Sequence, residues 1–189
     1  MRLRWVVVGC LGGIALFSIE AKAARVELGA QAVSLTVSEH PGRVVALHAE
    51  CLIPRSKPAV WRVLSDYDHL AEFVPFLTES RVIRHEPGVK ILRQKGRATL
   101  LIFHRHFEVT FRVTETDASH IRFEAIEGDF QRFIGSWHLE ERSGGTFVRH
   151  EVELQPKFYM PIWVMRVVER YVMLKSMDAV IARCLAASP

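Results

Sequence analysis

The chain has 189 residues, of which 49% are hydrophobic and 24% are charged, and this length suffices for one domain that buries its own core without disulfides or metal ions. Its formal net charge is only +4, which excludes the strongly basic balance of a nucleic-acid-binding domain. The sequence contains no Gly-rich phosphate loop, Cys-x-x-Cys, His-Glu-x-x-His or Gly-x-Ser-x-Gly motif. Nucleotide-loop, zinc-protease and serine-hydrolase chemistry therefore lack local support.

The first 23 residues have the pattern of a secretory signal peptide. Residues 1–4 are basic, residues 5–19 are mostly apolar, and Ala21 and Ala23 are the small residues that a signal peptidase reads. We expect cleavage after Ala23 and a periplasmic protein, whose net charge falls to +2 with the loss of three basic residues and one acidic residue. A lipid tether at Cys10 or an uncleaved anchor is less favoured, because the apolar run continues past Cys10 and is short for a bilayer span.

Two strands are expected next. Residues 26–37 alternate loosely between apolar and polar side chains, and residues 44–53 alternate clearly, with a Pro-Gly turn over 40–43 between them. The segment 24–43 is thus predicted to be an N-terminal strand and turn that extend the main domain, which covers 44–187.

The period then changes to that of helices. Ser56 is a suitable N-cap, Pro58 suits a first helical turn, and apolar residues in 60–64 have helical spacing. A second short helix over 69–73 ends before Pro75, because a residue that precedes proline disfavours helical geometry. Two short helices therefore follow the first core strand.

From Leu77 to Leu154 the chain reads as strands and turns. Apolar residues alternate with polar ones, and turn residues interrupt them at 86–88, 117–119, 128–129 and 143–145. One face of each strand is apolar, so the pattern predicts an antiparallel sheet with one buried face.

The last element is a long helix over 161–186. On its first half the apolar arc is wide and leaves only Arg166, Glu169 and Arg170 as a polar stripe, and past Lys175 the apolar face rotates. Such a helix needs a sheet that wraps around it, so the expected class is α+β, with a curved antiparallel sheet around a long C-terminal helix. The residues predicted to be apolar contacts are Val164, Met165, Val167, Val168, Tyr171, Val172 and Leu174, then Met177, Val180, Ile181, Cys184 and Leu185.

Two segments resemble a known family. The run over 53–82, with V-W-R-V-L-S-D-Y, F-V-P-F-L and S-R-V, and the run over 127–139, with G-D-F and G-S-W-H-L, resemble the polyketide cyclase/dehydrase and coenzyme Q-binding branch of the START-like (SRPBCC, birch-pollen-allergen-like) superfamily. This resemblance implies a helix-grip fold with a deep apolar cavity under the C-terminal helix. It also implies a lipid, quinone, sterol or polyketide ligand, and in a minority of members cyclisation or dehydration.

The inner face of such a sheet predicts the ligand site. His150 alternates with residues of the inner face, and it is either a core histidine whose hydrogen bonds are satisfied within the protein or an anchor for a ligand. A buried Arg105 would need an internal carboxylate or a ligand head group as its partner. Gln94 is the third polar candidate, and the rest of the lining is apolar. The predicted ligand-binding residues are Gln94, Arg105, Phe107, Val109, Phe111, Phe123, Trp137, His150, Val152, Met165, Val168 and Val172.

Other candidates for chemistry have simpler explanations. His104 and His106 share a strand face with charged residues, which indicates a solvated outer face and not a metal site. Cys51 and Cys184 are either two buried small hydrophobes or, in an oxidising compartment, a disulfide, and the sequence leaves both open. We predict no metal, no cofactor and no catalytic residue.

The leading functional hypothesis is a non-enzymatic carrier or sensor of a hydrophobic small molecule, without a nucleic-acid partner and with transient contact to a membrane. One alternative is a cyclase or dehydratase that uses His150 or Arg105. The other is an envelope protein-interaction module whose cavity is filled by Trp137, Phe111 and Met173, and the volume under the helix distinguishes it from the first two.

Overall fold

A computed structural model describes residues 22–28, 31–100, 103–159 and 161–187. The predicted signal peptide lies outside these residues except at its last two positions, so cleavage after Ala23 stays a prediction. The elements are β1 (Lys22–Leu28), β2 (Gln31–His40), β3 (Val44–Ile53), α1 (Lys57–Ser65), the 3-10 helix η1 (Tyr67–Glu72), β4 (Leu77–Glu86), β5 (Val89–Leu100), β6 (Phe103–Thr116), β7 (His120–Gly128), β8 (Phe130–Arg142), β9 (Gly145–Pro156) and α2 (Ile162–Ala186).

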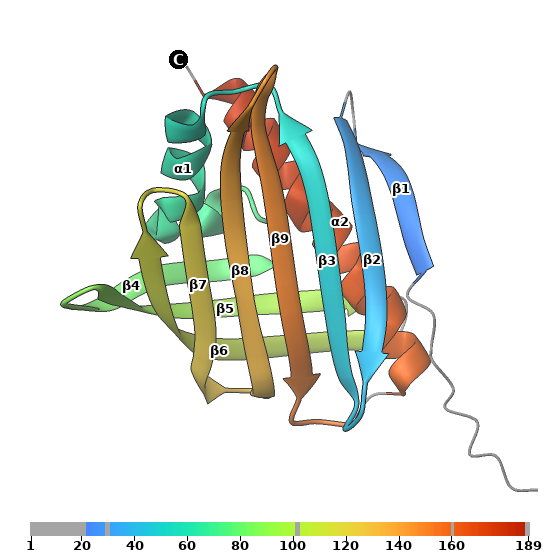
Figure 1. Ribbon diagram of the computed structural model, residues 1–189. Coiled ribbons are helices and arrows are strands. Elements are labelled where there is room, and N and C mark those ends of the chain that lie inside the picture. Colours follow the sequence, from blue (N-terminus) through green and yellow to red (C-terminus); the bar gives the residue numbers. More distant parts are fainter. Residues whose placement is uncertain (1–21, 29–30, 101–102, 160, 188–189) are drawn as a thin grey trace, which may run out of the picture.

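The nine strands of the described chain form one antiparallel sheet in the order β1-β2-β3-β9-β8-β7-β6-β5-β4. Figure 1 shows β4, β5 and β6 running across the direction of β8, β9 and β3, with α2 lying across the sheet. Register shifts between Thr110 and Phe111 and between Phe130 and Arg132 mark irregular pairing, and such extra residues bend a strand and increase its twist. The predicted α+β helix-grip architecture is confirmed.

The N-terminal extension differs from its prediction. The single strand expected over 26–37 is two strands, because β1 pairs with β2 in a register that joins Val26 to Val33 and Leu28 to Gln31. The apolar positions change from even numbers at Val26 and Leu28 to odd numbers at Val33 and Leu35, and Gly29 lies between the two runs. This change of phase was the signal that the single-strand prediction overlooked. β2 in turn pairs with β3, which makes the extension part of the main sheet.

The two short helices close one end of the sheet, as predicted. α1 has Pro58 in its first turn and buries Val60 and Leu64, while Trp61 packs partly buried against the core. η1 follows directly and buries Tyr67. These helices therefore pack apolar side chains against the end of the sheet that α2 also contacts.

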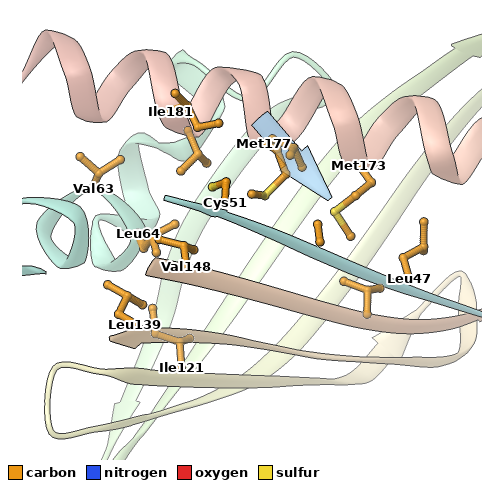
Figure 2. Packing of buried hydrophobic residues seen from close by; sticks show 14 of the residues in the cluster. Leu47, Cys51, Val63, Leu64, Ile121, Leu139, Val148, Met173, Met177 and Ile181 are labelled. Carbon is orange, nitrogen blue, oxygen red and sulfur yellow. The ribbon is translucent and has the colours of Figure 1, made fainter. Parts of the chain in front are cut away.

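The second half of α2 packs into a solid core, shown in Figure 2. Met177 and Cys184 are 0% exposed and Ile181 is 3% exposed, so the predicted rotation of the apolar face past Lys175 is correct there, although Leu185 is 37% exposed. Cys51 on β3 and Cys184 are both buried and free. Burial raises the pKa of the Cys51 thiol to about 12 and that of Cys184 to about 11, so both behave as small hydrophobes.

Candidate functional site

A cavity of about 260 Å³ lies under the first half of α2, facing β5 to β9 and η1. Its volume is just below the range of about 300–1,000 Å³ typical of small-molecule sites. The structure brings all twelve predicted residues to its wall: Gln94, Arg105, Phe107, Val109, Phe111, Phe123, Trp137, His150, Val152, Met165, Val168 and Val172. Binding of a ligand by these residues stays a prediction. Lining residues outside the predicted set include Tyr67, Phe130, Phe133, Phe158, Glu169 and Ser176.

One wall of the cavity is a cluster of phenylalanines. Phe111 makes edge-to-face contacts with Phe123 at 5.4 Å and with Phe133 at 5.0 Å between ring centroids, and Phe130 lies 4.9 Å from Phe133. Phe130 was missed because the irregular pairing between Phe130 and Arg132 breaks the strict alternation that the prediction assumed. Gly135 gives Phe123 its place, since a Cβ at Gly135 would lie 2.2 Å from the Phe123 ring.

His150 is held firmly inside the sheet. It is 7% exposed, its Nδ1 lies 2.9 Å from the Ser136 carbonyl oxygen, and its ring stacks on Trp137 with centroids 3.6 Å apart and planes 7° apart. Burial lowers the pKa of His150 to about 4, so the imidazole is neutral near pH 7. Because a carbonyl can only accept, Nδ1 donates and Nε2 is left as an acceptor; no described residue bonds to Nε2.

Gln94 and Arg105 differ in how far they are buried. The Gln94 amide donates to the Ser80 hydroxyl at 3.1 Å, and Ser80 donates to the Tyr67 carbonyl oxygen at 2.6 Å. Arg105, expected to be desolvated, is exposed, and its guanidinium lies 4.4 Å from the centroid of the Phe158 ring. Because Arg105 is both exposed and part of the lining, it marks the mouth of the cavity, and it needs no internal carboxylate.

Glu169 corrects the predicted polar stripe of α2. Arg166 is exposed as expected, but Glu169 lines the cavity. Burial among apolar side chains raises the pKa of Glu169 to about 7. A signal was present, because Met165, Glu169, Val172 and Ser176 follow one another at helical spacings of four, three and four residues and so share a face.

The outer face of α2 is more apolar than predicted. Val167 and Tyr171, expected to be buried, are 52% and 41% exposed, and Trp163 and Tyr159 are 64% and 81% exposed. The wide apolar arc thus serves two faces, one toward the cavity and one toward solvent. We call Trp163, Val167 and Tyr171 on α2, together with Tyr159 just before the helix, the aromatic stripe.

The raised pKa of Glu169 predicts a pH-dependent stability difference. Between its ordinary value of 4.5 and about 7, folded wild-type protein holds a proton that the unfolded chain loses, so the contribution of Glu169 to the free energy of unfolding falls as pH rises. Glu169→Gln removes this loss and should gain about 3 kcal/mol relative to wild type across that interval. His150 has a lowered pKa, so its contribution to the free energy of unfolding rises with pH, equally in wild type and in the variant. The measured quantity is therefore the difference in the free energy of unfolding between the two proteins, taken from urea unfolding curves at each pH. A difference that is constant with pH would contradict the prediction.

The described residues offer no support for a metal site or a membrane-spanning helix. They contain no group of three or more His, Cys, Asp or Glu side chains that could hold a metal ion. Within the same part of the chain, no helix is long and apolar enough to cross a membrane. His106 is exposed, as expected for the outer face of β6.

Comparison with known protein families identifies the family to which this fold and cavity belong. Residues 53–180 match the family described as polyketide cyclase / dehydrase and lipid transport. The chain belongs to this family. Membership of this family supports either binding of a hydrophobic ligand or cyclase activity, and it does not specify the ligand. No curated protein sequence shows significant similarity to the chain.

Solved structures share the fold of this family member. A STAR-related lipid transfer protein from Xanthomonas axonopodis is 17% identical, covers 87% of this chain and 98% of its own, and superposes with a TM-score of 0.70. The Zhui aromatase/cyclase from a Streptomyces species is 12% identical over 75% of this chain and 94% of its own, with a TM-score of 0.65. A third structure, TTHA0849 from Thermus thermophilus, is 21% identical over 76% of this chain and 99% of its own, with a TM-score of 0.63. At these identities the likeness concerns the fold alone.

Proposed function

We propose that this protein binds a hydrophobic small molecule, such as a lipid, quinone or polyketide-like compound, in the cavity under α2 and carries or senses it in the periplasm. The observation that carries the proposal is the cavity of about 260 Å³, whose wall is mostly apolar and whose polar groups are few. Such a lining accommodates an apolar body and orients one polar end. Trp137 and Phe111 line this open space and do not fill it, which argues against the interaction-module hypothesis.

The test is extraction of protein purified from its native envelope, followed by mass spectrometry of the extract. We expect one class of lipid-like compound at close to one molecule per protein. The same protein, stripped and refolded, should take up N-phenyl-1-naphthylamine, an uncharged probe that fluoresces in apolar surroundings. Protein that is repeatedly empty and also excludes the probe would contradict the proposal.

A cyclase or dehydratase is the second candidate, and Glu169 is the observation that favours it. A carboxyl with a pKa of about 7 is suited to proton transfer near neutral pH. His150 is a poor base by comparison, because its pKa is about 4. The carrier is preferred because no described residue hydrogen-bonds to Glu169 to form a relay. Incubation with a linear polyketide mimic separates the two: an enzyme converts it and loses that activity in Glu169→Gln, whereas a carrier returns it unchanged.

A carrier must meet the membrane from which its ligand comes, and we assign this contact to the aromatic stripe. Tryptophan and tyrosine partition to membrane interfaces, and Arg170 and Lys175 on the same helix suit anionic lipid headgroups. The stripe lies beside the cavity, since Tyr171 contacts Phe76, a lining residue, with ring centroids 5.8 Å apart.

Trp163→Ser should therefore weaken binding to vesicles of phosphatidylglycerol by about tenfold, because it removes one large side chain from the face that would enter the membrane interface. Cosedimentation measures the effect. Ile126→Ser, on β7 and 40% exposed in wild type, is the matched control and should leave vesicle binding unchanged. Equal loss in both variants, or no loss in Trp163→Ser, would place the membrane contact elsewhere.

A further inference from the structure

Glu169 is a carboxyl placed where a carrier of purely apolar molecules would have no use for one. It lines the cavity on the same helix face as Met165, Val172 and Ser176. Among the described residues, none donates a hydrogen bond to it and none forms an ion pair with it, although two arginines flank it on α2. Arg166 instead pairs with Glu39 on β2, its Nε 2.5 Å from a carboxylate oxygen. Glu169 is half-buried and faces the cavity, and a carboxyl in such apolar surroundings costs free energy unless water or a ligand satisfies it.

The groups that share the cavity with Glu169 do not supply a charge partner. The titratable or charged residues in the lining are Tyr67 from η1, Arg105 from β6 and His150 from β9, while β4, β5, β7 and β8 contribute uncharged groups only. Tyr67 donates to Glu115 at 2.7 Å, and burial raises its pKa far above the usual range. His150 is neutral, and Arg105 lies exposed against Phe158 at the mouth.

We propose that Glu169 anchors the polar end of an uncharged ligand bearing a hydroxyl or carbonyl group, and that ionisation of this carboxyl releases the ligand. This inference rests on the proposed binding function and deepens it. A protonated carboxyl donates to a ligand oxygen and can also accept from a hydroxyl. The Nε2 acceptor of His150 and the Ser176 hydroxyl are two further uncharged partners in the same lining.

The same inventory excludes a ligand whose buried end is anionic. A carboxylate or phosphate inside the cavity would meet an acidic side chain and a neutral histidine, and a buried charge without a partner is strongly disfavoured. The lining's cation, Arg105, is exposed at the mouth, so an anionic headgroup would have to remain there. The inner end of the ligand is therefore an alcohol, phenol, quinone or ketone.

The pH at which the ligand is released follows from the pKa of the Glu169 carboxyl. Below about pH 7 the carboxyl is protonated in the empty protein, and a bound ligand oxygen stabilises that form further. Above this pH, binding must compete with ionisation, so affinity falls by about tenfold for each further pH unit as long as only the protonated form binds. The pH dependence belongs to Glu169, because His150 completes its titration well below this interval.

The experiment compares 1-dodecanol with dodecanoate, which differ only at the polar end, as competitors for bound N-phenyl-1-naphthylamine. Wild-type protein should bind dodecanol about thirtyfold more weakly at about pH 8.5 than at about pH 6. At both pH values it should bind dodecanoate more weakly than dodecanol. Glu169→Gln, which keeps a donor at every pH, should bind dodecanol with no pH dependence. Glu169→Leu should bind it weakly at both pH values while still taking up the probe. Glu127→Gln, an exposed glutamate on β7, is the matched control and should titrate like wild type.

The outcomes separate the two proposals. If dodecanol affinity in wild type does not change with pH, or changes equally in Glu169→Gln, the assignment to Glu169 is wrong, while probe binding still supports a ligand cavity. If dodecanoate binds as tightly as dodecanol, the uncharged ligand class is wrong. If folded wild-type protein binds neither the probe nor either competitor, the binding function itself fails.

Discussion

A chain that ends at Pro161 should not fold: we expect aggregated or molten protein without a cooperative urea transition. The truncation removes α2, whose buried residues are Val164, Met165, Val168, Met173, Met177, Val180, Ile181 and Cys184. Each large buried side chain contributes about 1.5–3 kcal/mol, and together they match or exceed the net stability of about 5–15 kcal/mol that a domain of this kind has. The apolar face of the sheet would be left open to water.

Circular dichroism and urea unfolding measure this outcome, and a chain that ends at Ala187 is the control. That control keeps all of α2, including the contact in which Arg55 Nε donates to the Cys184 carbonyl oxygen at 3.1 Å, and should unfold like the full chain. A soluble product that ends at Pro161 and unfolds cooperatively would show that the sheet is stable without its helix. The helix would then be a lid and not part of the core.

The fold could be predicted from sequence because its signals are local and repeated. Alternation along the strands gave the inner faces of β6 and β8 correctly, and Pro58 and Pro75 marked the short helices. Failures occurred where a signal depends on partners far along the chain. The change of phase between β1 and β2 occurs within a few residues and is easily read as part of one strand. The irregular pairing at Phe130 becomes visible only in the register of β8 with β9.

The candidate site shows the same division between the sheet and the helix. The sheet residues lie on the inner face as expected, because a strand has only two faces and one of them is apolar, while their role in binding stays a prediction. α2 was predicted less well, since its apolar arc is wide and a helical wheel does not state which part of that arc meets the sheet. In the structure Trp163 and Tyr171 face solvent, and Glu169 faces the cavity. Once Met165 and Val172 are known to face the cavity, Glu169 between them must do so as well.

The single substitution with the largest expected effect on binding is Met165→Trp. Met165 is 1% exposed and lines the cavity from α2, so the larger indole extends into a space of about 260 Å³ that the ligand would occupy. The bound compound recovered by extraction should fall at least about tenfold, and uptake of N-phenyl-1-naphthylamine should fall with it. Overfilling of a packed site costs about 1–3 kcal/mol, which a domain of ordinary stability tolerates.

Ala182→Trp is the matched control for Met165→Trp, because it adds an indole to the same helix at an exposed position outside both the cavity and the aromatic stripe. It should keep the extracted ligand and the probe at wild-type levels. Urea unfolding of both variants shows whether lost binding reflects a filled cavity or a lost fold. The informative result is a Met165→Trp protein that unfolds cooperatively and no longer holds ligand. If that folded protein still carries a full complement, the ligand lies somewhere other than under α2, and the cavity is not the binding site.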